Sequence, residues 1–165
     1  FDQVLIKEPN NIKGLLGAGS LAFHRGDTKK ADIYFNRLLE NEPANDKALC
    51  GLGMLRMHSK DLEGAMEYFC QALDVNPDNI STCKYLLELS YAVDNFEKIE
   101  FYLHKYMELH PANLNMRFGL AGVQYKLGKF EESIENLEHI LTLDPNHKLA
   151  CKLIENVKSD MVLSK

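Results

Sequence analysis

The sequence predicts an all-α solenoid built from antiparallel helix pairs, and three observations lead to this fold class. All five prolines of the 165-residue chain lie 34 positions apart, at Pro9, Pro43, Pro77, Pro111 and Pro145. A residue that can cap a helix follows each proline at the same distance, and apolar residues recur in the same columns between the prolines. This period is typical of helix–turn–helix units that stack on one another to bury a shared core.

The first helix of each unit is expected to start two residues after its proline. The residues at that place are Asn11, Asn45, Asn79, Asn113 and His147. An asparagine side chain accepts a backbone N–H of the first helical turn, so an N-cap is expected in all but the last unit. The second helices are expected to start at Asp27, Asp61 and Asn95, with Lys129 breaking the pattern. Gly26 and Gly128 mark the turn between the helices, and the proline ends the second helix.

The core is expected to consist of apolar columns that repeat from unit to unit. In the first helices these columns are Ala18, Leu52, Leu86 and Leu120, and Leu21, Leu55, Leu89 and Val123. In the second helices the large column is Phe1, Phe35, Phe69, Leu103 and Leu137. Small residues allow close helix approach, but residues 80–113 instead carry Leu87, Ile99 and Tyr106. These larger side chains are expected either to be accommodated by compensating packing or to bend the solenoid locally.

At these columns the chain resembles the tetratricopeptide repeat family. Residues 46–79 match its pattern best, with Leu49, Leu52, Gly53, Ala65, Phe69, Ala72 and Pro77. The resemblance covers four full repeats, at 12–45, 46–79, 80–113 (atypical) and 114–147. It implies that residues 1–11 are the second half of an earlier, truncated repeat, and that residues 148–165 are a capping helix and tail. The implied fold is a right-handed superhelical solenoid.

Composition narrows the function classes. The net charge is −5 without a basic cluster, which argues against a nucleic-acid surface, and no apolar run approaches the length of a membrane span. The four cysteines lack the spacing of a metal site; they are Cys50, Cys70, Cys83 and Cys151. We expect them to be buried thiols in a reducing compartment, which favours a cytoplasmic location.

No pattern of catalytic residues emerges, so the chain is expected to be neither an enzyme nor a cofactor-binding protein. His24 and His58 lie one repeat apart and can meet on one rim, but no third metal ligand recurs beside them. An acidic run is expected to form a solvated helix face; it consists of Glu131, Glu132, Glu135 and Glu138. Phosphate-binding loops and nucleophile motifs are absent from the sequence.

The resemblance implies that the first helices line a concave groove to which extended peptides bind. The candidate partner-binding residues are Leu16, Phe23, Lys47, Met54, Met57, Lys84, Glu88, Tyr91, Phe118, Tyr125 and Lys126. Among them Phe23, Met57, Tyr91 and Tyr125 occupy one column of large, adaptable side chains. The inner positions carry four lysines against the single glutamate Glu88, so the groove is expected to be basic relative to the rest of the chain.

These residues predict a non-catalytic scaffold that binds a peptide or helical segment of a partner protein through apolar anchors and acidic flanks. The alternative is a substrate-binding or regulatory segment of a larger enzyme, such as a glycosyltransferase, since repeats of this family are often fused to such domains. A second alternative is self-association, because the half-repeat at Phe1, Val4 and Leu5 can stack on another copy.

Overall fold

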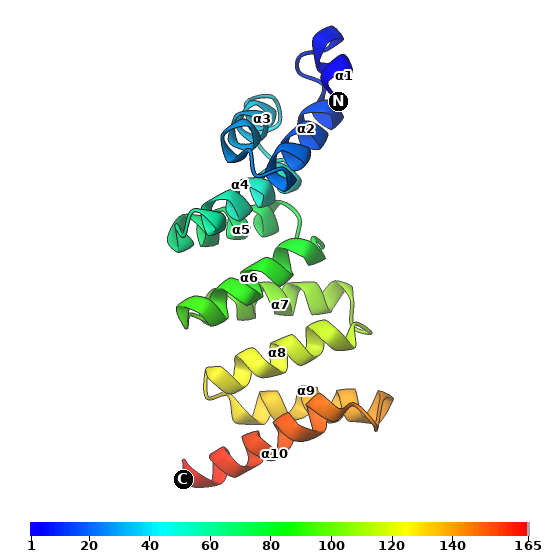
Figure 1. Ribbon diagram of the computed structural model, residues 1–165. Helices are drawn as coiled ribbons and strands as arrows, with labels where there is room; N and C mark the ends of the chain where they lie inside the picture. Colours follow the sequence, from blue (N-terminus) through cyan, green and yellow to red (C-terminus); the bar gives the residue numbers. More distant parts are fainter. Residues whose placement is uncertain (165) are drawn as a thin grey trace. The chain divides into compact units, whose positions relative to one another are not determined.

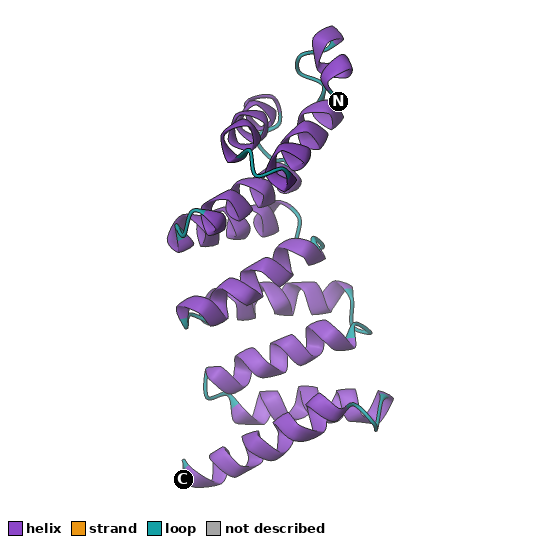
Figure 2. Ribbon diagram, in the orientation of Figure 1, coloured by secondary structure: helices purple, strands orange, loops and turns teal. Residues whose placement is uncertain are grey.

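The computed structural model describes residues 1–164, so residue 165, the last of the expected tail, lies outside the described residues. Over this range every regular element is a helix (Figures 1 and 2), which confirms the all-α fold class. The helices are α1 (Asp2–Lys7), α2 (Ile12–His24), α3 (Thr28–Asn41), α4 (Asp46–His58), α5 (Leu62–Val75), α6 (Ile80–Val93), α7 (Glu97–Leu109), α8 (Leu114–Lys126), α9 (Phe130–Leu143) and α10 (Lys148–Leu163). None of these helices is long and apolar enough to cross a membrane.

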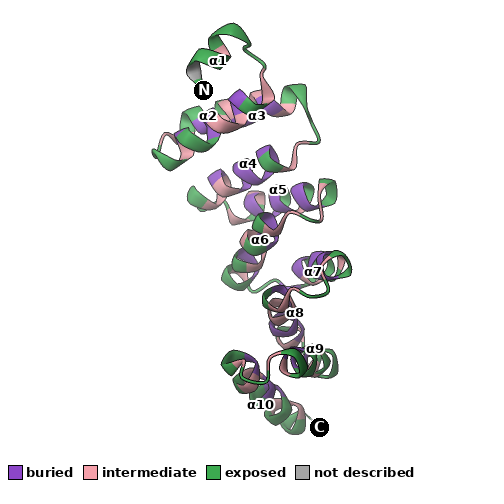
Figure 3. Ribbon diagram, turned by 90° about the vertical axis from the view of Figure 1, so that its right-hand side faces the viewer, coloured by how far each residue is buried: buried purple, intermediate pink, exposed green. Residues whose placement is uncertain are grey.

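The chain forms two compact units, and each is described by itself. Unit 1 runs from Phe1 to Leu89, and unit 2 starts at Ser90, within α6. In unit 1, α2 packs on α3 and α4 on α5; in unit 2, α8 packs on α9 and α9 on α10. Figure 3 shows that buried residues follow the faces on which α4 and α5 meet. Each helix pair therefore buries its own apolar stripe.

Side chains cap the helices that follow the prolines. The N–H groups of Gly14, Ala48, Thr82 and Met116 donate to the side chains of Asn11, Asn45, Asn79 and Asn113, at 2.9 to 3.1 Å. His147 caps α10 in the same way, because its Nδ1 accepts the Ala150 N–H at 3.1 Å. The cap therefore extends to all five positions, one more than the asparagine column predicts.

The second helices differ more in how they start. Asp27 and Asp61 cap α3 and α5 as predicted, through the N–H groups of Lys30 and Gly64. In α7 the N-cap is Phe96, one residue after the predicted Asn95, and it makes no side-chain cap hydrogen bond. Phe96 is buried, so its apolar ring helps to fix this helix start by packing instead.

The turn inside each helix pair has one conformation throughout the chain. Gly26 and Gly128 have φ values of 78° and 71°, as the turn prediction requires. The equivalent residues Lys60 and Asp94 have φ values of 64° and 52°, so the left-handed conformation is kept without glycine. Because a Cβ atom is unfavourable in this region, these two turns carry backbone strain.

Most of the predicted core columns are buried, with two corrections at the N-terminal end. Leu55, Leu89 and Val123 are buried as expected, but Leu21 in the same column is 41% exposed, and Phe1 is 60% exposed. The physical reason is that α1 has six residues against 14 in α3, so little described chain packs on these side chains. The expected self-association surface has Phe1 and Val4 exposed, and self-association itself stays a prediction.

Two of the three large residues at 80–113 lie inside the core. Ile99 is fully buried and Tyr106 is 4% exposed, while Leu87 is half-buried. The hydroxyl oxygen of Tyr106 accepts a hydrogen bond from Asn113 Nδ2 at 3.2 Å, which satisfies its polar end. These contacts agree with accommodation by compensating packing.

Over the described residues the four cysteines form no disulfide bond, and the expectation that they are buried is correct for only two. Cys50 and Cys83 are buried, whereas Cys70 and Cys151 are half-buried. Burial raises the pKa of the Cys83 thiol to about 12, so this thiol is protonated at neutral pH.

Candidate functional site

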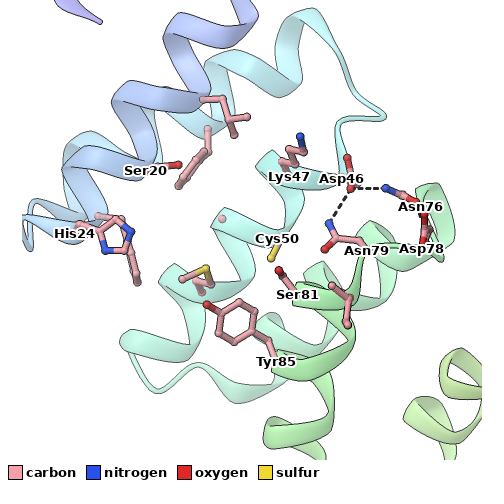
Figure 4. A pocket seen from close by; sticks show the side chains of 16 residues that line it. Ser20, His24, Asp46, Lys47, Cys50, Asn76, Asp78, Asn79, Ser81 and Tyr85 are labelled. Atoms are coloured by element: carbon pink, nitrogen blue, oxygen red, sulfur yellow. Dashed lines mark hydrogen bonds between the residues drawn. The ribbon is translucent and has the colours of Figure 1, made fainter. Parts of the chain in front are cut away.

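A pocket of about 550 Å³ opens in unit 1 between α2, α4 and the start of α6 (Figure 4). Its apolar lining consists of Leu16, Phe23, Phe35, Met54, Ile80 and Tyr85. Its polar lining includes Ser20, His24, Asp46, Lys47, Cys50, Asn76, Asp78, Asn79 and Ser81. Binding pockets commonly have this volume and this combination of an apolar wall with a few polar groups.

Two glycines make room for the Phe35 ring, which belongs to the lining of the pocket. A Cβ atom at Gly19 would lie 2.7 Å from the Phe35 ring, and one at Gly51 would lie 2.6 Å from it. The ring therefore fits between the backbones of α2 and α4 only because both positions lack a side chain. Phe35 is only 3% exposed, so most of the ring is covered by the protein.

The apolar wall comes from the inner faces of α2, α4 and α6. Leu16, Phe23 and Met54 are half-buried, so part of each side chain is covered and part is accessible. Tyr85 takes the place that glycine has in the preceding repeats, and its ring stacks on Phe69 with centroids 5.7 Å apart. The wall is thus held by core contacts and does not need a ligand to order it.

A hydrogen-bonded cluster forms the opposite, polar end of the pocket. Asp46 Oδ2 accepts hydrogen bonds from Asn76 Nδ2 at 2.8 Å and from Asn79 Nδ2 at 2.7 Å (Figure 4). Asn79 also caps α6, so one side chain links the helix start to the pocket. In the two preceding caps the amide donates to a nearby glutamate instead, Glu8 or Glu42.

The pocket is not basic. Apart from His24, the lining residues that carry a charge at neutral pH are the carboxylates Asp46 and Asp78 and the cation Lys47. Burial raises the pKa of the Cys50 thiol, and the negative charge of Asp46 adds to this rise.

Four of the predicted partner-binding residues in unit 1 line this pocket, namely Leu16, Phe23, Lys47 and Met54. Met57 is half-buried outside the lining, and Lys84 and Glu88 are exposed on α6 outside it. Prediction missed Asp46, Asn76, Asp78, Asn79 and Tyr85 as pocket residues. The sequence signal for these residues is the polar stretch around Pro77, which also marks a helix boundary.

The two histidines considered as metal ligands both lie near the Phe23 ring. The centroid of the Phe23 ring is 6.1 Å from that of His24 and 6.2 Å from that of His58, edge-on to both. Over the described residues, no group of three His, Cys, Asp or Glu side chains is arranged to hold a metal ion.

In unit 2 the predicted binding residues are partly occupied by contacts within the chain. The Tyr125 hydroxyl donates to Asp160 Oδ2 of α10 at 2.5 Å, and this hydrogen bond raises the pKa of Tyr125. Phe118 packs on the ring of His147, with centroids 5.6 Å apart. Lys126 remains exposed beside Tyr125.

Tyr91 offers the most accessible aromatic surface among the predicted residues of unit 2, with 46% of the residue exposed. Its ring meets Phe96 edge-on at 5.0 Å, and a Cβ atom at Gly122 would lie 2.8 Å from its hydroxyl oxygen. Partial burial raises the pKa of Tyr91, so its hydroxyl is a neutral hydrogen-bonding group at neutral pH.

Sequence profiles described as tetratricopeptide repeats match more than half of the chain. One profile matches residues 46–79 and 114–147, and a second matches residues 14–45. Residues 80–113, which carry the larger core side chains, lie between the matched segments. No curated protein sequence is significantly similar to this chain.

Several solved structures share the fold at low sequence identity. YrrB, described as a TPR protein with an unusual peptide-binding site, has a TM-score of 0.78 and 16% identity, over 96% of this chain and 81% of YrrB. MamA has a TM-score of 0.69 and 17% identity, over 92% of this chain and 86% of MamA. A tetratricopeptide repeat protein from Parabacteroides merdae ATCC 43184 has a TM-score of 0.67 and 19% identity, over 94% of this chain and 62% of that protein.

Proposed function

This chain belongs to the tetratricopeptide repeat family, whose fold supports protein–protein interaction, and we propose that it binds an extended or helical segment of a partner protein in its concave groove. The principal contact is an apolar side chain of the partner, inserted into the pocket of unit 1. Acidic residues of the partner that flank this anchor meet the exposed Lys47 at the rim. A scaffold of this kind uses binding rather than chemistry.

The apolar wall of the pocket is the observation that carries this proposal. Leu16, Phe23 and Met54 present partly exposed apolar surface around a preformed cavity of about 550 Å³. Apolar surface that converges on a cavity favours the burial of a partner side chain, at roughly 25 cal/mol per Å² of apolar area removed from water. Because the wall is already ordered by contacts with the core, little binding energy is spent on ordering it.

The exposed residues of unit 2 supply a separate contact surface. Tyr91 and Lys126 are exposed, whereas Tyr125 and Phe118 are engaged by α10 and its cap. A partner segment that binds to unit 2 is therefore expected to contact Tyr91 more than Tyr125. Similarity to a structure whose description names a peptide-binding site supports the same class of ligand.

The test starts from peptides selected on the intact chain from a random-peptide display library. The dissociation constants of fluorescein-labelled selected peptides are measured by anisotropy for the unaltered chain and for the Phe23→Ala, Met54→Ala double variant. We expect the double variant to bind at least about tenfold more weakly, because it removes apolar contact area from the pocket. The matched control is Ile33→Ala, which removes a side chain that is 62% exposed on α3.

Circular dichroism establishes that each variant is folded before binding is measured. Unchanged dissociation constants in a folded double variant would place the binding surface elsewhere and contradict the proposal. Equal losses in the double variant and in Ile33→Ala would contradict it as well.

A further inference from the structure

One carboxylate in the pocket has no cationic partner among the described residues. Asp46 Oδ2 accepts hydrogen bonds from two neutral amides, those of Asn76 and Asn79, while Oδ1 accepts none. Lys47 follows it in the chain, but the two side chains form no ion pair. The amides hold the carboxylate in place without cancelling its charge.

The surroundings of Asp46 strengthen the attraction between its carboxylate and a cation. Asp46 is half-buried, and the lining of the same pocket includes the apolar side chains of Leu16, Phe23 and Met54. A charge interacts more strongly with an opposite charge next to such side chains than in open water. The position at the start of α4 also stabilises a carboxylate through the helix dipole, but that effect supplies no counter-ion.

From this placement we infer that the pocket of unit 1 selects a partner segment that carries a lysine or arginine next to its apolar anchor, with Asp46 as the counter-ion. The aliphatic part of such a side chain packs on the apolar wall while its cationic end reaches the carboxylate. The two asparagine amides orient Asp46 in advance, so the ion pair costs little reordering of the protein.

The inference rests on the proposed function, because it specifies which peptides the same pocket prefers. The partner segment then has two kinds of charged residue, which contact different residues of the protein. Acidic residues face Lys47 at the rim, whereas the residue beside the anchor is basic. The partner segment is therefore of mixed charge around an apolar centre.

The test uses the peptides selected by display on the intact chain. We expect lysine or arginine to be enriched beside the large apolar residue. Each labelled peptide is then synthesised a second time with that basic residue replaced by norleucine, which keeps the aliphatic chain and removes the charge. Binding of both forms to the unaltered chain is measured at about 50 mM and at about 500 mM salt.

Two protein variants complete a double-mutant cycle. Asp46→Asn removes the charge and keeps the shape, and Glu67→Gln makes the same change of net charge at an exposed site on α5. We expect Asp46→Asn to weaken the basic peptide at least about tenfold, to leave the norleucine peptide within about twofold, and to reduce the salt dependence. Glu67→Gln should leave both peptides unchanged.

The outcomes distinguish this inference from the proposed function. If Phe23→Ala, Met54→Ala abolishes binding but norleucine replaces the basic residue without loss, the pocket binds peptides and the inference is wrong. If Asp46→Asn weakens both peptides equally, Asp46 has a structural role only, and the inference is again wrong. If the double variant has no effect on binding, the proposed function fails, and the inference fails with it. The norleucine measurement uses the unaltered protein, so it does not depend on any variant folding.

Discussion

Residues 46–79 and residues 80–113 share the same helix-start and proline signals, but they pack with side chains of very different size. In the first segment the Phe69 ring lies against Gly53, where a Cβ atom would be 2.5 Å away. The second segment has Leu87 at the place of Gly53, and Tyr85 at the place of Gly51 stacks on the same phenylalanine. The comparison teaches that caps and prolines define a helix pair even where the small residues of close packing are replaced.

The two segments also differ in how their second helices begin. Asp61 caps α5 by accepting the Gly64 N–H, whereas α7 starts at the buried Phe96 without a side-chain cap. One helix start is thus specified by a local hydrogen bond, and the other by packing. In residues 46–79 the starts of both helices are therefore marked by a capping side chain, whereas in residues 80–113 only the start of the first helix is.

Exchange of the large and small residues between the two segments is expected to have the largest effect. Gly53→Leu introduces at position 53 the residue type found at the equivalent position 87. The fully buried Phe69 ring leaves no room for this side chain, so we expect a loss of about 3 kcal/mol in the free energy of unfolding. Leu87→Gly removes a half-buried side chain and adds a helix glycine, with an expected loss of about 2 kcal/mol. Urea unfolding followed by circular dichroism measures both.

The loss of stability in Gly53→Leu is expected to exceed the loss in Leu87→Gly. A Gly53→Leu variant as stable as the unaltered chain would show that Phe69 relaxes readily, and that residues 46–79 tolerate the packing seen in 80–113. Gly53→Ala serves as the matched control, because it adds only the Cβ atom at the same place.

Removing an N-cap side chain from each of the two segments should have a smaller effect on stability than the exchange at positions 53 and 87. Asn79→Ala removes the cap of α6 and one of the two amides that hold Asp46, so we expect a loss of about 2 kcal/mol in the free energy of unfolding. Asn45→Ala removes a cap whose amide donates to the nearby Glu42, with an expected loss of about 1 kcal/mol. Equal losses in the two variants would mean that the hydrogen bond from Asn79 to Asp46 adds nothing to stability.

The smallest expected effect concerns the turn inside each helix pair. Both segments have a non-glycine residue with positive φ there, whereas the neighbouring segments have a glycine. Lys60→Gly and Asp94→Gly relieve a left-handed backbone conformation, and each should raise the free energy of unfolding by about 0.5 kcal/mol. Gly26→Ala adds a Cβ atom to the same conformation and should lower it by about 1 kcal/mol. Thermal unfolding compares the three variants, and a destabilised Lys60→Gly would show that the lysine makes a compensating contact.

The helix pairs could be predicted from the sequence because their signals act over a few residues. A proline removes a backbone donor, and an asparagine or aspartate accepts a backbone N–H three residues further on, whatever the rest of the chain does. The observed caps at Asn11, Asn45 and Asn113 are of this kind. The start of α7 was misplaced by one residue because a buried ring replaces the local hydrogen bond there.

The candidate site could be predicted only in part, for a related reason. The resemblance to the repeat family predicts that Leu16, Phe23 and Met54 lie on the inner face, and they do line one pocket. The same resemblance predicts Tyr125 and Phe118 on that face, but it does not indicate that Asp160 and His147 engage them. A repeat pattern describes equivalent positions, whereas these contacts are made by residues that differ between repeats.

Signals between near neighbours in the sequence specify the helix pairs, the places where most of them begin, and the side chains that form the greater part of the core. The tertiary structure is needed to show that Asp46 meets Asn76 and Asn79, which are 30 and 33 residues away, and that Tyr125 is held by Asp160, 35 residues away. Helix starts and turns depend on hydrogen bonds and sterics between near neighbours in the chain. The charge and accessibility of a pocket depend instead on which distant side chains the stacking of helices brings together.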